Sequence, residues 1–136
     1  MSYMAWEANF ETGIAQVDAE HRSLVETVNR LHDAMKQGRA KAEVAGILDF
    51  LADYTGKHFA HEESLMQRHD YPGYARHKEI HDKLVAQVTG LIGTIQKGEV
   101  VLSLDLMDFL QDWLTRHILQ EDQAFARHFR DRGIRF

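Results

Sequence analysis

The feature that most limits what this chain can fold into is an apolar pattern with the period of an α-helix, repeated in four segments. The segments cover about residues 19–37, 41–68, 73–96 and 104–130. Asp18 is the expected N-cap of the first. Four amphipathic helices joined by short loops predict an all-α, up-down-up-down four-helix bundle, preceded by an irregular arm at residues 1–17.

Length, composition and net charge limit the class of protein to which the chain can belong. A length of 136 residues and a single proline predict one domain, and the lack of cysteine excludes thiolate metal ligands and disulfides. A formal charge of −5 with both signs interleaved disfavours nucleic-acid binding. No apolar run approaches the roughly 20 residues of a membrane span and no leader pattern precedes the helices, so the expectation is a soluble, cytoplasmic protein that binds neither membrane nor nucleic acid.

Each apolar stripe is interrupted by ionisable side chains that do not belong in a hydrocarbon core. Burying an unpaired carboxylate costs several kcal/mol, and the surrounding Leu, Val and Phe offer inward imidazoles no hydrogen-bond partners. A bound cation would satisfy both kinds of group. The interrupting residues on the four segments are His21, His58, Glu62, His77, His81 and His117.

The spacing of these residues supports a metal site. His58 with Glu62, and His77 with His81, are separated by four residues, so each pair projects from one helix face. Any single histidine here could equally be a hydrogen-bonded core or surface residue, and that interpretation is kept for His32, His61, His69 and His128, with His61 expected to point away from the stripe of His58 and Glu62. Five imidazoles with at least two carboxylates predict a pair of metal ions, and the donor types suit iron, manganese, cobalt or zinc.

The stretch "HILQED" offers His117 two candidate carboxylates. Regular helix geometry, at about 100° per residue, favours Glu121 and turns Asp122 away. The apolar stripe, however, shifts by about 100° between the residues before His117 and the group Phe125 and Phe129. A π-bulge would produce such a shift and would turn Asp122 inward and Glu121 aside, while curvature or fraying of the helix end is the alternative.

Four motifs together resemble the hemerythrin family, most of all its bacterial branch, the bacteriohemerythrins. They are "VDAEHRSL", "HFAHEESLM", "YPGYARHKEIH" and "WLTRHILQED". The resemblance implies a four-helix bundle with a non-haem diiron centre that binds dioxygen reversibly. It assigns one iron to His77, His81 and His117 and the other, with a vacant position, to His21 and His58. By the same resemblance, the two iron ions are bridged by Glu62, Asp122 and an oxo or hydroxo group, and the apolar oxygen pocket is lined by Leu24, Phe59, Trp113, Leu114 and Ile118.

The function expected from this resemblance is non-enzymatic binding of dioxygen for its storage, transport or delivery. One alternative is an oxygen- or redox-sensing domain of a chemotaxis or other signalling protein, in which a protein partner would receive oxygen or a signal. A second is a diiron oxidase, although such sites draw on glutamates more than on histidines. The third is a metal-free helical interaction module.

Overall fold

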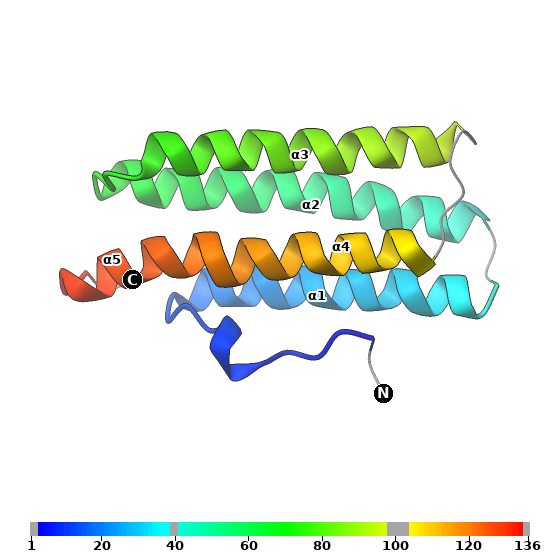
Figure 1. Ribbon diagram of the computed structural model, residues 1–136, viewed down its shortest axis with the longest axis horizontal. Helices are drawn as coiled ribbons and strands as arrows, with labels where there is room; N and C mark the ends of the chain where they lie inside the picture. Colours follow the sequence, from blue (N-terminus) through cyan, green and yellow to red (C-terminus); the bar gives the residue numbers. More distant parts are fainter. Residues whose placement is uncertain (1–2, 39–40, 98–103, 135–136) are drawn as a thin grey trace.

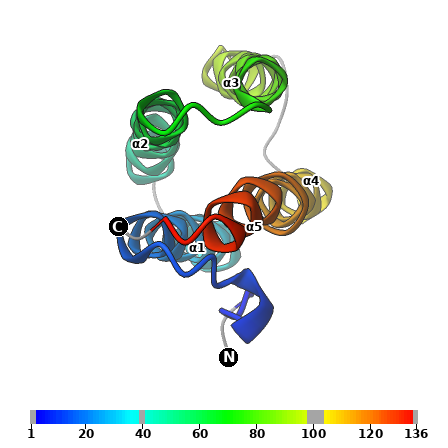
Figure 2. The same cartoon turned by 90° about the vertical axis from the view of Figure 1, so that its left-hand side faces the viewer.

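The structure, a computed structural model, describes residues 3–38, 41–97 and 104–134, and the side chains of 41–42, 104–106 and 118–120 lie outside that description. Its helices form a four-helix bundle in which α1 packs on α2 and α4, and α2 packs on α3 (Figures 1 and 2). No described residue lies in a β-strand, so the predicted all-α fold is confirmed. After one 3-10 turn, η1 (Ala8–Phe10), the elements are α1 (Ala15–Lys36), α2 (Lys41–Arg68), α3 (Tyr74–Gln96), α4 (Leu104–Arg116), η2 (His117–Asp122) and α5 (Gln123–Asp131).

The start of α1 corrects one expectation. The helix begins at Ala15, and the backbone N–H of Asp18 already donates to the carbonyl of Ile14 at 2.9 Å, so Asp18 is inside the first turn and is not the N-cap. Its carboxylate instead accepts hydrogen bonds from the backbone N–H and hydroxyl of Thr12, at 2.8 and 2.7 Å, and from the N–H of Gly13. The chain folds back at Gly13, whose φ of +87° is readily adopted only by glycine. Asp18 therefore holds the arm against α1.

The core consists of two apolar clusters with a layer of polar side chains between them. Along α1, Val17 belongs to the small cluster, His21 to the polar layer and Leu24 to the large cluster. The other long helices repeat this order. Their residues at the end of the bundle near Ile14 and α5 pack in the small cluster, and their residues toward the opposite end pack in the large cluster. The large cluster includes Leu24, Leu51, Phe59, Val88, Trp113 and Leu114, and the small cluster includes Val17, Leu65, Met66, Phe125 and Phe129.

The fourth rod of the bundle, which is the continuous helical run of α4, η2 and α5, is not a regular α-helix. Between α4 and α5 the backbone of residues His117–Asp122 winds as a π-helix, which confirms the predicted π-bulge. A π turn holds one more residue than an α turn and so rotates everything after it. This rotation lets Leu110 and Leu114 before the turn, and Phe125 and Phe129 after it, all be buried in the core.

The N-terminal arm is attached to the bundle at both of its described ends. Met4 and Asn29 on α1 exchange two hydrogen bonds, of 2.7 and 2.8 Å, and the hydroxyl of Tyr3 donates to Asp108 on α4 at 2.6 Å. Nearer to α5, the side-chain amide of Gln123 donates to the carbonyls of Phe10 and Glu11 at 3.2 and 3.0 Å. The arm therefore follows the outside of α1 as far as the π segment (Figure 1).

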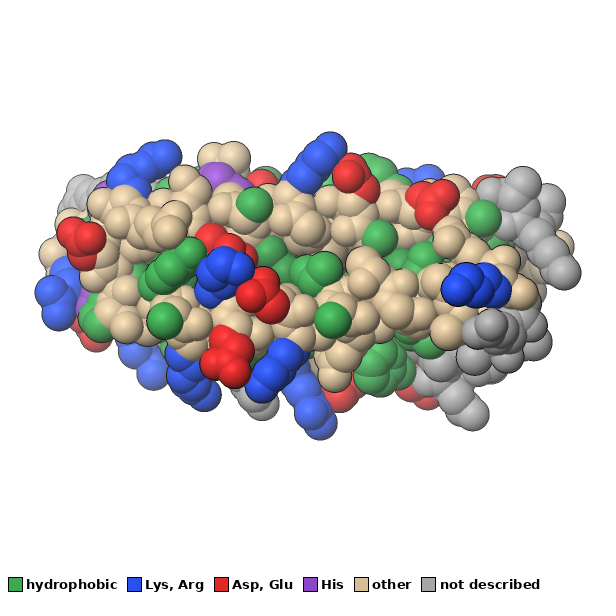
Figure 3. All heavy atoms as spheres, turned by 90° about the horizontal axis from the view of Figure 1, so that it is seen from above, with side chains coloured by type: hydrophobic (Ala, Val, Ile, Leu, Met, Phe, Trp, Pro, Cys, Tyr) green, Lys and Arg blue, Asp and Glu red, His purple; other side chains and the backbone are tan. Residues whose placement is uncertain are grey.

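The surface is mixed in charge on the face shown in Figure 3. Lysine and arginine side chains alternate there with aspartate and glutamate, and a narrow line of hydrophobic side chains runs between them. None of the helices in the described part of the chain has the length and apolar character that crossing a membrane requires.

Candidate metal centre

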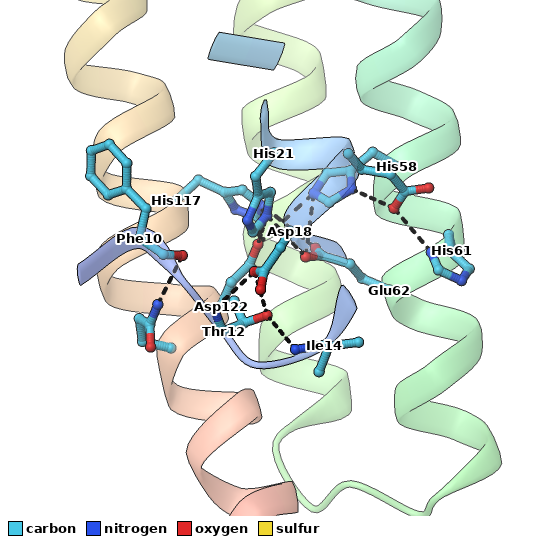
Figure 4. A network of polar contacts seen from close by, with 12 residues as sticks. Phe10, Thr12, Ile14, Asp18, His21, His58, His61, Glu62, His117 and Asp122 are labelled. Carbon is cyan, nitrogen blue, oxygen red and sulfur yellow. Dashed lines mark hydrogen bonds and ion pairs between the residues drawn. The ribbon is translucent and has the colours of Figure 1, made fainter. Parts of the chain in front are cut away.

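The polar layer brings together all seven side chains that the sequence and the family resemblance single out as metal ligands. His21 comes from α1, the pair His58 and Glu62 from α2, the pair His77 and His81 from α3, and His117 and Asp122 from the π segment. The exposed fraction of none of them exceeds 3%. Figure 4 shows His21, His58, Glu62, His117 and Asp122 pointing toward one another from three sides of the bundle. Four elements thus converge on one buried layer.

The carboxylate of Glu62 divides four of the imidazoles into two pairs. Its Oε2 atom lies 3.4 Å from Nε2 of His21 and 3.3 Å from Nε2 of His58. Its Oε1 atom lies 3.1 Å from Nε2 of His81 and 3.4 Å from Nε2 of His117. Each oxygen therefore faces a different pair, as a carboxylate that bridges two cations would.

Asp122 divides the imidazoles differently. Its Oδ1 atom is 3.1 Å from Nε2 of His77, while Oδ2 is 2.6 Å from Nε2 of His21 and 2.8 Å from Nε2 of His117. His117 consequently lies between the two halves of the layer: Glu62 pairs it with His81, and Asp122 pairs it with His21. By proximity alone, the ligand atoms fall into one group with His21, His58 and His117 and another with His77 and His81, both sharing Glu62 and Asp122.

The imidazoles are oriented as a metal would require. All five present Nε2 to the inner carboxylates. Two of them use the other nitrogen outward: Nδ1 of His58 lies 2.9 Å from Glu20, and Nδ1 of His81 lies 2.9 Å from Glu63. An ionised carboxylate can only accept, so these Nδ1 atoms donate and leave the Nε2 lone pairs free to bind a cation.

Several buried polar atoms of the layer lack a hydrogen-bond partner among the described residues. They include both oxygens of Glu62 and the Nε2 atoms of His58, His81 and His117. Buried polar atoms without partners are costly, and here they face one another at 3.1 to 3.4 Å. The donor set, of imidazole nitrogens and carboxylate oxygens, suits borderline divalent metals. The residues therefore fit a pair of metal ions.

The electrostatics of the layer favour cations. Burial by itself would lower the pKa of His117, but the charges of Asp122 and Glu62 outweigh burial and raise that pKa to about 9. For Asp122, burial and the charge of Glu62 oppose ionisation, yet the contact with His117 lowers its pKa overall. The positive charge of His58 also lowers the pKa of Glu62 against the effect of burial, so two carboxylates stay ionised in the core and attract positive charge, whether protons on imidazoles or metal ions.

Apolar side chains cover the layer on the side of the large cluster. The ring of Phe59 stacks on His81 with 3.9 Å between centroids and lies 4.6 Å from His117, and Trp113 lies 6.4 Å from Phe59. Leu24 and Leu114 are fully buried in the same cluster. The side chain of Ile118, the fifth residue expected around an oxygen pocket, lies outside the described residues.

Two acidic residues and one histidine have roles that the sequence did not reveal. His61, interpreted as an ordinary surface residue, does point away from the polar layer, yet its Nδ1 lies 3.0 Å from the carboxylate of Glu20 that also holds His58 (Figure 4). Burial opposes ionisation of Glu20, but the hydrogen bonds from His58 and His61 outweigh it and lower the pKa of the carboxyl. The only signal in the sequence is that Glu20 and Glu63 each stand next to a predicted ligand.

Glu121, the other candidate in "HILQED", does not enter the layer. Its side chain is half-buried, and after burial itself its negative charge is the next cause of the raised pKa of Tyr71, a neighbour of the small cluster. The π turn thus separates the two adjacent carboxylates, with Asp122 inward and Glu121 toward the end of the bundle.

Comparison with known proteins adds an independent line of evidence. Residues 12–129 match the model of the hemerythrin HHE cation binding domain. The chain is 37% identical over 126 residues to the bacteriohemerythrin of Pseudomonas aeruginosa, covering 93% of this chain and 81% of that protein. It is 36% identical over 127 residues to the bacteriohemerythrin of Methylococcus capsulatus, covering 93% and 96%. The crystal structure of a wild-type hemerythrin superposes with a TM-score of 0.86 at 35% identity, covering 93% of this chain and 97% of that one.

Proposed function

Because the chain belongs to the hemerythrin family, we propose that it binds dioxygen reversibly at a pair of iron ions and serves to store, transport or deliver oxygen, without acting as an enzyme. The observation that carries this proposal is the polar layer, in which five buried imidazoles present Nε2 to two buried carboxylates. A metal-free interaction module would have no use for that arrangement, since its buried charges would only reduce stability.

The ligands are proposed to divide as the family resemblance implies. His77, His81 and His117 would hold one ion and His21 and His58 the other, with Glu62 and Asp122 bridging. The split of Glu62 supports this division, because its Oε1 faces His81 and His117 while its Oε2 faces His21 and His58. An iron pair supplies, when bound, a reversible two-electron reduction of dioxygen. Two imidazoles against three leave the half at His21 and His58 open to a small ligand.

The protein's own contribution is a water-poor approach to that open half. Leu24, Phe59, Trp113 and Leu114 are buried beside the polar layer and carry no group that ionises near neutral pH. We propose that they form the oxygen pocket. An apolar wall without an acid or base limits the delivery of protons to the bound ligand, and loss of the ligand in a protonated form is the route by which reversibility fails.

An optical spectrum through one cycle tests this function. Protein reconstituted with iron and reduced should develop a visible charge-transfer absorption on exposure to oxygen, and the absorption should vanish on deoxygenation. Iron analysis should give about two ions per chain, as two ligand groups require. Steady oxidation of an added substrate, or uptake of iron beyond that ratio, would instead favour an oxidase; no reversible spectral change would refute the proposal.

Sensing is a second candidate that one contact favours. Gln123 follows the ligand Asp122 directly and its amide holds the carbonyls of Phe10 and Glu11, so the arm is attached beside the metal layer. A sensor would pass its state to a protein partner through such a contact. Limited proteolysis within the arm at equal rates in the oxygenated and deoxygenated protein would argue for the carrier role.

A further inference from the structure

We infer that Glu20 and Glu63 are positioning residues of the metal centre: each clamps the outer nitrogen of a ligand imidazole on a neighbouring helix and thereby sets how strongly that imidazole donates to the metal. The inference rests on the proposed function, because it assigns roles around the same pair of ions. Neither residue reaches the inner layer, so both act through His58 and His81.

The first clamp joins α1 to α2. Glu20 directly precedes the ligand His21 on α1, yet its Oε1 accepts from Nδ1 of His58 on α2, at 2.9 Å. The same oxygen accepts from Nδ1 of His61, at 3.0 Å, one turn further along α2. Two imidazoles on one helix therefore fix a carboxylate that a single bond would leave free to rotate.

The second clamp joins α2 to α3. Glu63 directly follows the ligand Glu62 on α2, and its Oε2 accepts from Nδ1 of His81 on α3, at 2.9 Å. Its other oxygen lies 4.0 Å from Nζ of Lys78, one turn before His81. In each clamp, a carboxylate next to one ligand in the sequence holds the imidazole of a ligand on another helix. The two helices that a clamp joins therefore cannot rotate independently.

The clamps have a direct chemical effect on the ligands. A carboxylate that accepts from Nδ1–H fixes the tautomer with Nε2 unprotonated and makes that nitrogen a stronger donor. The negative charge of Glu63 is partly offset by Lys78, whereas the contacts of Glu20 within the described part of the chain are with the imidazoles of His58 and His61. His58 is therefore expected to be the more strongly activated of the two.

The unclamped ligands provide an internal contrast. The Nδ1 atoms of His21 and His117 are buried and have no hydrogen-bond partner among the described residues. These two imidazoles are instead the ones closest to Asp122, at 2.6 and 2.8 Å. The five imidazoles thus divide into two that a carboxylate holds from outside, His58 and His81, and three that face Asp122 inside the layer, His21, His77 and His117.

Zinc-loaded protein tests the inference without dioxygen chemistry. Glu20→Gln and Glu63→Gln remove the charge but keep the shape, and each should release zinc to a chelator about 10- to 100-fold faster than the unaltered protein, with the larger effect at Glu20. Asp82→Asn is the matched control for Glu63, because Asp82 lies 3.1 Å from the same Lys78 without touching a ligand. Glu26→Gln, on the exposed face of α1, is the control for Glu20. Both controls should stay within about twofold of the unaltered protein.

A second measurement requires no variant. In zinc-loaded protein, nitrogen NMR should show His58 and His81 protonated at Nδ1, with both Nδ1–H protons protected from exchange. Protonation at Nε2, or clamp variants that release zinc no faster than their controls, would overturn the inference while leaving two bound ions and the proposed function intact. Failure of the unaltered protein to bind two ions of either zinc or iron would overturn both.

Discussion

Two segments of the bundle solve the same problem with different backbones. In α2, His58 and Glu62 are separated by four residues and a regular α-helix points both into the polar layer. In the fourth rod, His117 and Asp122 are separated by five residues, and both reach the layer because the backbone there winds as a π-helix. The comparison teaches that the spacing of the proposed ligands and the helix geometry depend on each other, since a spacing of five positions instead of four is tolerated only where the turn holds one more residue.

Single-residue deletions should break this comparison most severely. Deleting Ala60, an exposed residue of α2, turns Glu62 and everything after it by about 100° relative to His58, so Leu65 and Met66 leave the small cluster. Deleting Gln120 converts the π turn into an α turn, which keeps Asp122, Phe125 and Phe129 facing the core. The first variant should lose cooperative unfolding in a thermal melt, and the second should keep it and still bind metal. Equal damage from both deletions would show that the π turn is not an inserted residue.

The next largest effect should come from removing Asp122, the inward-facing carboxylate of the π turn, with removal of its outward-facing neighbour Glu121 as the comparison. Asp122→Ala leaves His21, His77 and His117 without their inner partner, so metal content should fall from about two ions per chain to one or fewer. Loss of one member of a buried charged network should also cost about 3–5 kcal/mol of unfolding free energy. Glu121→Ala should retain both ions, because that side chain is half-buried beside Tyr71. The reverse ranking in a metal assay would reject the assignment of Asp122.

Both segments contribute buried ionisable side chains to the polar layer, so both make the stability of the protein depend on pH. The pKa of His117 is raised from 6.5 to about 9, and that of His58 is also well above its usual range. Stability from these imidazoles is therefore fully present below about pH 6.5 and is lost as the pH rises toward 9. The pKa values of Glu62 and Asp122 are lowered, so their contribution is lost as the pH falls below about 4.

Metal-free protein should accordingly be most stable between about pH 4.5 and 6.5, and zinc should shift that optimum upward, because metal replaces the protons on the imidazoles. Denaturant melts across this range check both statements. A metal-free stability that keeps rising from pH 6.5 to 9 would contradict the electrostatic account for both segments at once.

The same comparison shows which features of the structure could be predicted from the sequence. The helical period places His58, Glu62, His77 and His81 on inward faces, because a regular helix has one geometry. The π turn was also predictable, since the apolar stripe changes direction around His117. The start of α1 was not, because Asp18 has the residue type of an N-cap and only the fold of Thr12 and Gly13 over it shows another use. The partners of Glu20 and Glu63 lie on other helices, so no local pattern contains them.

The smallest expected effect concerns a defect within the regular segment. Thr55 on α2 is fully buried, and its hydroxyl has no hydrogen-bond partner among the described residues. Burying such a hydroxyl costs free energy, so Thr55→Val, which keeps the shape of the side chain, should raise the unfolding free energy by about 1 kcal/mol. Thr27→Val on α1 is the matched control, because that buried hydroxyl donates to the carbonyl of Ser23 at 2.7 Å and its loss should lower stability by about the same amount. Urea melts of the metal-free proteins measure both changes. If Thr55→Val lowers the unfolding free energy as much as Thr27→Val does, the Thr55 hydroxyl makes a hydrogen bond within the core. The buried hydroxyl of α2 then has a partner, and the regular helix carries no such defect.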